Sequence, residues 1–490
     1  MKLILVIAGV FLTIIAYTQA FNFPTLEKDK STNETPPFVK VLKKLHQGPA
    51  KATGFANRAQ VTTEWITQKL DHFDSTQTET WQMRYMINDE FFKPGGPMFI
   101  YVGGEWEINA SGITYGIFVD LAKEHNGMLF YTEQRYYGES RPTLDLRLEN
   151  LKYMSVKQSL ADLAHFIEYQ RETVDELANS KVIMAGASYA ATMVVWFKKL
   201  YPQLLNGGWA SSAPLMAKVN FLEFMEVTAK AWHLLGGEEC YQHIENAFLQ
   251  YDEMAKNKRG AELKAILKLC NEFDVYNDLD VWTLFSILGM GIFGGLAQYQ
   301  KDNDISMYCN YFMSFGDDVS ALANFLFLAF GLSEGCIDAT YKNVLTFHMD
   351  TSYANEWARP FFYQACNELG WFHTSDSKNQ PFSRNFPLEL SMALCRDIFG
   401  SLYSQSNIHQ LVEATNDVFG GLDPQVENIY MTHGSLDPWS ILGHGELEGA
   451  TILPNASHCQ DFDSISPSDS PEMRRSKERL AELVREWLAD

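Results

Sequence analysis

Short apolar runs with the length and composition of buried strands occur in two separate parts of the chain. They cover residues 97–102, 128–132, 181–185, 428–432 and 450–453. When helices alternate with such runs, the pattern predicts a parallel α/β sheet. Because the pattern resumes late in the chain, we expect both parts to contribute strands to one sheet, with the segment between them as an insertion.

Amphipathic helices are expected next to these runs. Ser155 and Gln158 form a capping-box pair, after which apolar residues recur on one face. A second helix is expected over 189–200, directly after the third strand. The last helix should start at Ser470, which can cap it, with Pro471 in its first position.

The middle of the chain differs in composition. Leu, Met and Phe recur there at helical spacing, and six of the seven cysteines fall in it. We expect a mainly helical insertion held by disulfides. The predicted organisation is a signal peptide (1–20), a propeptide or flexible arm (21–55), a first part of the α/β domain (56–215), the helical insertion (216–400) and a second part of the α/β domain (401–490).

The N-terminus has the features of a secretory signal peptide. Lys2 provides a positive start, the run from Leu3 to Ala16 is almost wholly apolar, and Ala20 suits cleavage. The run is too short to span ~30 Å of hydrocarbon, and we expect no later stretch to be apolar enough for a membrane span. The mature protein is therefore predicted to be soluble, without a membrane partner, and either secreted or lysosomal.

Cysteines tend to pair in the secretory pathway. Six cysteines in one segment suggest three bridges among 15 possible pairings, which leaves Cys459 as a free thiol. No two cysteines have the spacing of metal ligands, so we expect no metal, and we expect no cofactor. Asn33, Asn109 and Asn455 each begin a glycosylation sequon.

The charge of the chain restricts its partners. The formal net charge is -22, and nucleic acids or anionic membranes would require clustered Lys and Arg. We therefore expect no nucleic-acid partner. With 490 residues the chain can bury a large core, and a homodimer is left open.

Ser188 lies in the segment Gly186–Ala190, between a predicted strand and a predicted helix. This is the setting of a nucleophile elbow, where small residues permit a sharp turn that exposes the serine hydroxyl. The usual motif ends in glycine, and here Ala190 occupies that position. Taken alone, such a segment is more often an ordinary turn.

A serine nucleophile needs a histidine base and a carboxylate that orients the histidine. In α/β-hydrolases the acid and then the histidine follow the serine, each on a loop after a strand. Asp437 follows the strand at 428–432, and His458 follows the strand at 450–453. The sequence therefore predicts the catalytic triad Ser188, Asp437 and His458.

Competing assignments remain among neighbouring residues. His433 and His444 are alternative bases, but both flank the loop of the predicted acid and neither follows a strand of its own. Asp461 and Asp463 are the next candidates for the acid.

An oxyanion that develops during acyl transfer needs preorganised N–H donors. The backbone N–H of Tyr189 is one candidate. The second is expected in the segment Gly103-Gly104-Glu105, where glycine permits close approach, and we assign it to Gly104. The alternative interpretation of these glycines is a tight turn.

With these motifs the sequence resembles the S28 family of serine peptidases, closest to its thymus-specific branch. The resemblance runs from about Trp65 to the C-terminus. Its anchors are Gln68–Phe73, Arg84–Tyr85, Gly103–Glu105, Glu133–Ser140, Gly186–Tyr189, Gly434–Trp439 and Ser457–Asp461.

The resemblance implies an α/β-hydrolase fold with an inserted, mainly helical, disulfide-linked cap over the active site. It implies peptide substrates, cleaved near a terminus, often after proline and at acidic pH. It also implies three disulfides, Cys240–Cys309, Cys270–Cys336 and Cys366–Cys395.

Three residues are candidates for substrate binding. They are Glu105, Trp439 and Phe462, of which the two aromatic residues could form walls of an apolar S1 pocket. The alternative is that these aromatics only fill the core. Ala187 and Thr192 depart from the family pattern, and Thr192 stands where proline-cleaving members have a larger apolar residue.

Two other functions are compatible with the same fold. The triad would also serve an esterase or lipase, and a non-catalytic hydrolase-fold protein would bind ligands or partners. Labelling of Ser188 by a fluorophosphonate would separate the enzymes from the binding protein.

Overall fold

The computed structural model of the chain describes residues 61–489, apart from 302, 331–334 and 356–357. The predicted signal peptide and N-terminal arm lie outside the described residues, and so does Asn33.

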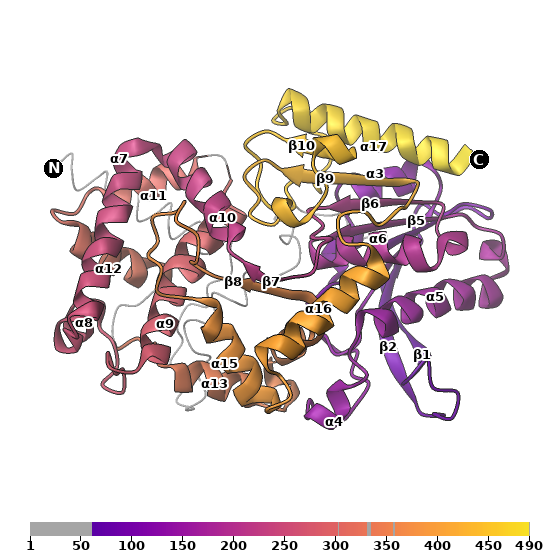
Figure 1. Cartoon of the computed structure of the whole chain (residues 1–490). Helices are drawn as coiled ribbons and strands as arrows, with labels where there is room; N and C mark the ends of the chain where they lie inside the picture. Colours follow the sequence, from indigo (N-terminus) through magenta and orange to yellow (C-terminus); the bar gives the residue numbers. More distant parts are fainter. Residues whose placement is uncertain (1–60, 302, 331–334, 356–357, 490) are drawn as a thin grey trace.

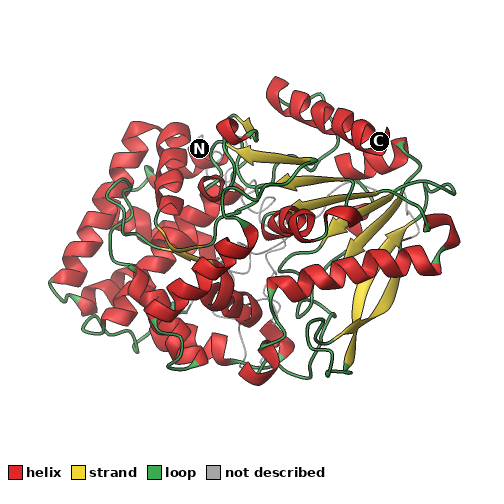
Figure 2. Ribbon diagram, turned by 45° about the vertical axis from the view of Figure 1, so that its right-hand side comes forward, coloured by secondary structure: helices red, strands yellow, loops and turns green. Residues whose placement is uncertain are grey.

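Eight strands form one twisted sheet in the order β1-β2-β4-β3-β5-β6-β9-β10 (Figure 2). The strands are β1 (Thr62–Lys69), β2 (Thr80–Asn88), β3 (Met98–Val102), β4 (Met128–Thr132), β5 (Val182–Ala187), β6 (Gly207–Ser211), β9 (Ile429–Gly434) and β10 (Thr451–Leu453). β2 is antiparallel to both β1 and β4, and every other neighbouring pair is parallel. The expected α/β-hydrolase fold is confirmed, and both parts of the chain contribute to its sheet.

Helices cover both faces of the sheet (Figure 1). One face packs against α5 (Val156–Thr173) and α6 (Tyr189–Leu200), and the other packs against α3 (Ile117–Glu124) and α17 (Pro471–Ala489). A further helix, α16 (Gln405–Phe419), packs on α6.

The predicted helix starts are confirmed at both positions. The Ser155 hydroxyl accepts the N–H of Gln158 before α5, and the Ser470 hydroxyl accepts the N–H of Met473 before α17. The Gln158 side chain does not complete the capping box but donates to Asp71 instead.

Between β6 and α16 the chain forms a mainly helical part, which we call the helical unit (residues 218–399). Its helices are α7 (Glu223–Lys256), α8 (Gly260–Leu267), α9 (Asp278–Ser286), α10 (Gly295–Tyr299), α11 (Asp304–Phe312), α12 (Asp318–Phe330), α13 (Tyr341–Met349), α14 (Ala358–Gln364) and α15 (Leu388–Phe399). A two-stranded parallel sheet pairs β7 (Lys218–Phe221), at the start of the unit, with β8 (Gly370–His373). The helical unit lies beside the sheet in Figure 1.

Three disulfides cross-link the helical unit. They are Cys240–Cys309, Cys270–Cys336 and Cys366–Cys395, as the family resemblance implied. Cys459 is a free thiol.

One sequence-based expectation about membrane spans was wrong. Among the described residues, the helical run Asp278–Tyr299 is long and apolar enough to cross a membrane. In the structure, 78% of the most apolar 18-residue stretch of this run is buried. This run is therefore explained as a core helix of the helical unit.

The Gln68–Phe73 anchor attaches the β1–β2 ribbon to α5. His72 Nε2 lies 2.7 Å from the Asp162 carboxylate, which also accepts from Arg135 Nε at 2.6 Å. The side chain of Gln68 donates to the Asp162 carbonyl at 3.0 Å. The motif is explained by this buried polar network rather than by contact with the proposed catalytic residues.

Glu368 of the helical unit contacts the N-terminus of α5. Its carboxylate oxygens accept the N–H of Val156 at 3.1 and 3.0 Å. Burial raises the pKa of Glu368 to about 7, although the hydrogen bond from Val156 opposes this. The protonation of this carboxyl therefore changes near neutral pH, at a contact between the two parts of the molecule.

Replacing Glu368 by Gln should remove part of the pH dependence of stability. The folded pKa lies above the ordinary value of 4.5, so the proton is bound more tightly in the folded state. The resulting stabilisation is complete below about pH 4.5 and is lost as pH rises towards 7. A shift of this size corresponds to about 3 kcal/mol.

We expect calorimetry to give similar free energies of unfolding for the wild type and Glu368→Gln at pH 4.5. At pH 8 the variant should be more stable. Glu389→Gln, at an exposed position of α15, is the control and should follow the wild type. Parallel stability profiles for the wild type and Glu368→Gln would contradict this assignment.

Candidate active site

Ser188 lies at the sharp turn between β5 and α6. Its backbone has φ 58° and ψ −130°, in the region that side chains rarely adopt, at a cost of about 1–3 kcal/mol. A Cβ at Gly186 would lie 2.4 Å from the carbonyl oxygen of Ala190, so glycine is required there. Ala187 and Ala190 are buried without such a conflict. The close approach thus limits side-chain size at 186, and an alanine fits at 190.

Asp437 and His458 lie on the loops after β9 and β10. His458 Nδ1 is 2.9 and 3.0 Å from the two Asp437 carboxylate oxygens. The backbone N–H of Trp439 donates to the same carboxylate at 2.9 Å. His458 Nε2 is buried and makes no hydrogen bond within the described ranges. This nitrogen is therefore available to accept a proton.

The pKa values of this pair move in opposite directions. Burial disfavours the charge on His458, but the negative charge of Asp437 and the neighbouring Cys459 outweigh it and raise the His458 pKa well above its usual value. Burial likewise opposes the Asp437 charge, but His458 more than compensates, so the Asp437 pKa is lowered. Asp437 therefore remains a carboxylate that stabilises the imidazolium form of His458.

The competing histidines occupy different environments. His433 is buried in β9, and burial lowers its pKa to about 4, so it is neutral at ordinary pH. His444 Nε2 lies 3.0 Å from the Leu422 carbonyl. Of these three histidines, His458 is the one that hydrogen-bonds to Asp437.

Ser211, the last residue of β6, connects the elbow to the histidine loop. Its carbonyl accepts the N–H of Ser188 at 2.9 Å and lies 3.8 Å from the Cys459 sulfur. Its hydroxyl donates to the buried Asp461 carboxylate at 2.6 Å, which also accepts from Thr432 at 2.6 Å. Asp461 therefore holds strand ends together. Sequence reasoning considered Asp461 only as a substitute acid and did not identify Ser211.

The two predicted oxyanion donors lie at the carboxyl ends of β5 and β3. Tyr189 is the first residue of α6, so its backbone N–H is one of the donors at a helix N-terminus. A Cβ at Gly104 would lie 2.4 Å from the Trp106 ring, which explains the glycine. Gly103 donates its N–H to the Thr132 carbonyl at 2.9 Å.

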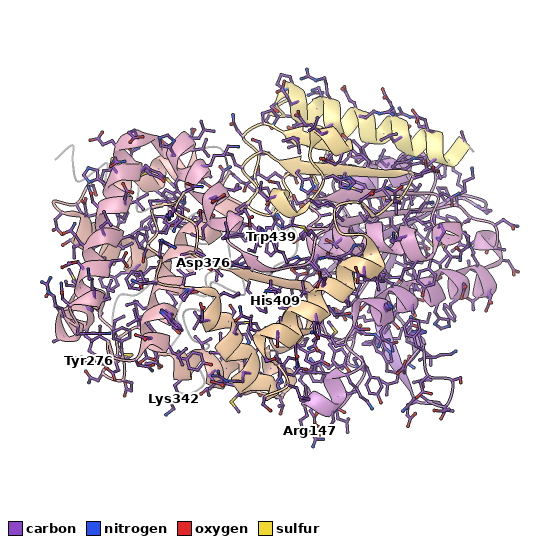
Figure 3. All side chains as sticks on the ribbon, viewed as in Figure 1. Arg147, Tyr276, Lys342, Asp376, His409 and Trp439 are labelled. Atoms are coloured by element: carbon purple, nitrogen blue, oxygen red, sulfur yellow. A yellow bond between two sulfur atoms is a disulfide. The ribbon has the colours of Figure 1, made fainter. Side chains whose placement is uncertain are left out.

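Trp439 lies between the sheet and the helical unit (Figure 3). Its ring centroid is 6.3 Å from that of His458 and 5.6 Å from that of Trp371. The Trp371 ring lies edge-on to Tyr189 at 5.9 Å. Aromatic side chains therefore lie next to His458 and next to Tyr189, the residue after Ser188.

Glu105 is buried directly after Gly104. Burial, followed by the charge of Glu105, raises the pKa of Tyr137 well above its usual value. Burial also raises the pKa values of Tyr189 and Tyr299, and the negative charge of Glu105 contributes to both increases. Glu105 thus lies among the tyrosines near the elbow.

Phe462 does not take the predicted place. Its ring packs against Tyr101 at 5.6 Å and Trp209 at 4.4 Å, in the cluster on the α3 and α17 side of the sheet. Its carbonyl accepts the N–H of Ile117 in α3. Proximity to His458 in the sequence does not place this side chain at the site, because the intervening turn directs it to the opposite face.

The described part of the chain contains no group of three His, Cys, Asp or Glu side chains that could hold a metal ion. The fold and the paired loops are those of an α/β-hydrolase of the serine-hydrolase class. A sequence model of the serine carboxypeptidase S28 family matches residues 68–480. The chain belongs to this family and is a serine-type peptidase.

Two named sequence relatives support the same classification. The thymus-specific serine protease of Mus musculus is 27% identical over 452 residues, 87% of this chain and 87% of its own. The lysosomal Pro-X carboxypeptidase of Bos taurus is 25% identical over 469 residues, 90% of this chain and 91% of its own. The solved proline iminopeptidase of Mycobacterium smegmatis aligns with TM-score 0.34 and 11% identity, over 87% of this chain and 100% of its own.

Replacing Asp437 by Asn should reduce peptide hydrolysis by about 10³- to 10⁴-fold at every pH, because the imidazole can then hold the wrong tautomer. The Asp437 charge raises the His458 pKa, so the acid limb of the residual activity should move to lower pH. The measurement is kcat/KM from pH 4 to 9. Asp463→Asn, at an exposed position, is the control. Near wild-type rates for Asp437→Asn would remove Asp437 from the mechanism.

Proposed function

We propose that this serine peptidase cleaves peptides near a terminus through an acyl-enzyme at Ser188. The observation that carries the proposal is the buried Asp437–His458 pair with a free Nε2, on loops at the same sheet edge as the strained Ser188. In this mechanism His458 is the general base and Asp437 orients it.

Each step has a group to perform it. His458 Nε2 takes the proton of the Ser188 hydroxyl while the oxygen attacks the peptide carbonyl carbon. The N–H groups of Tyr189 and Gly104 stabilise the oxyanion. His458 then gives the proton to the leaving amine. In the second half, His458 takes a proton from water as the water attacks the ester, and then returns this proton to the Ser188 oxygen as it leaves.

The substrate pocket is proposed to lie against Trp439 and Trp371. These rings offer an apolar surface for proline or a small apolar P1 residue. Thr192 is buried, with its hydroxyl bonded to the Pro214 carbonyl at 3.0 Å, so it adds no apolar surface to a pocket. Glu105 is proposed to contact a polar part of the substrate. A relative named Pro-X carboxypeptidase supports a preference for proline.

The helical unit is proposed to restrict access to peptide ends. Its Gln364 donates to the hydroxyl of Tyr189, the residue after the nucleophile, at 2.8 Å. A structure in this place leaves less room for a chain that continues on both sides of the scissile bond. The serine protease relatives favour this function over an esterase or a non-catalytic binding protein.

We propose a secreted or lysosomal location. The predicted signal peptide, the three disulfides and a relative named lysosomal support it. Asn455 is exposed and Asn109 is half-buried at the start of a short helix, and both are proposed as glycan acceptors.

Ser188→Ala should fold normally and lose several orders of magnitude in peptide hydrolysis, because triad members act as a unit. A fluorophosphonate probe should label the wild type at Ser188, as mapped by mass spectrometry, and should not label the variant. The control is Ser468→Ala, at an exposed serine outside the proposed triad. Activity retained in pure, folded Ser188→Ala would remove the assignment.

Terminal specificity can be read from a peptide library digested at pH 5. We expect products that lack one or two residues at a single end, with proline or a small apolar residue before the cut. Mass spectrometry of the products identifies both the end and the P1 residue. Predominant cleavage in the interior of long peptides would contradict the exopeptidase proposal.

A further inference from the structure

The histidine loop follows a strand at the edge of the sheet. This strand, β10, has three residues and pairs only with β9. The Asp437 loop follows β9 itself. The relative position of acid and base therefore depends on a short edge strand, which gives limited support.

A segment of the helical unit supplies the missing support. The backbone N–H of His458 donates to the Gln298 carbonyl at 3.2 Å. The Ser457 hydroxyl lies 2.6 Å from the Ala297 carbonyl and 2.8 Å from the Gln298 carbonyl. The end of α10 is thus bonded to the backbone of the base and to the residue before it.

The side chain of Gln298 reaches the other loop. Its Oε1 accepts the indole N–H of Trp439 at 3.1 Å, and Gln298 is 1% exposed. Trp439 in turn donates its backbone N–H to Asp437. One residue of the helical unit therefore bonds the loop of the base through its backbone and the loop of the acid through its side chain.

Neighbouring residues strengthen the same contact. Gln300 donates to the Asn455 carbonyl at 3.2 Å and accepts from the Gln460 side chain. The Tyr299 ring lies edge-on to His458, with centroids 6.4 Å apart. The contact therefore extends along the whole histidine loop.

We propose that Gln298 is a positioning residue, which fixes His458 and Asp437 relative to each other. Their geometry then depends on how the helical unit packs against the two loops. This inference rests on the proposed function, since it assigns how the triad is held. Gln298 contacts neither the nucleophile nor the reacting atoms in this assignment, so it acts through Trp439 and His458.

The test is Gln298→Met, which keeps the length of the side chain and removes the strong acceptor for Trp439. We expect kcat to fall about tenfold, the effect of losing one buried hydrogen bond, with KM for a short peptide changed less than twofold. The rate of fluorophosphonate labelling at Ser188 should fall by the same factor. Gln380→Met is the matched control, because Gln380 is a buried glutamine whose bonds to Ser375, Ser377 and Ser383 stay within the helical unit.

A double-mutant cycle with Trp439→Phe tests the particular bond. If Gln298 acts through the Trp439 indole, the double variant should be no slower than the slower single variant. Fully additive losses, or equal losses in Gln380→Met, would overturn the inference in favour of general destabilisation of the helical unit.

A signal that needs no turnover separates this inference from the proposed function. The proton NMR resonance of His458 Nδ1–H, identified by its loss in Asp437→Asn, should shift or broaden in Gln298→Met. If the wild type does not hydrolyse peptides but this signal responds, the proposed function fails and the positioning role stands. An unchanged signal with unchanged kcat would overturn the positioning role.

Discussion

The proposed catalytic loops depend on the hydrogen bonds made by Ser211 at the end of β6. A parallel sheet brings the ends of neighbouring strands to one edge, but this alone leaves the loops free to move relative to each other. Ser211 removes that freedom, since its carbonyl receives the Ser188 N–H and its hydroxyl reaches Asp461 beyond the base. Asp461 also binds Thr432 of β9. These bonds fix the elbow and the loops of Asp437 and His458 relative to the ends of β6 and β9.

Because the Asp437–His458 pair is buried, its charged groups need hydrogen bonds that replace those to water. A buried carboxylate is costly unless hydrogen bonds compensate for lost water, and here the imidazole and the Trp439 N–H do so. The nearby His433 has no such carboxylate bond, and its lowered pKa keeps it neutral. The pKa values of these two buried histidines therefore shift in opposite directions, because only His458 has a carboxylate partner that outweighs burial.

The sequence predicted some elements better than others, for local reasons. α6 was predicted at its observed bounds, and the Pro471 helix start was confirmed, because turn chemistry and apolar periodicity are readable within a few residues. β6 was missed because Gly207–Ser211 has little apolar character and is buried only by its neighbours on both sides. Phe462 was misplaced because closeness along the chain does not decide which face of the sheet a side chain enters.

By itself the sequence determined five of the strands of the sheet, the elbow at Ser188, the helical insertion and the short set of candidate acids and bases. These follow from patterns within single segments and from their order along the chain. Only the tertiary structure decided that Asp437 bonds His458 while Asp461 braces the strands, and that Gln298 reaches both loops. A hydrogen bond forms only within about 3 Å, and the partners here come from segments distant in sequence, so their pairing depends on how the whole chain packs.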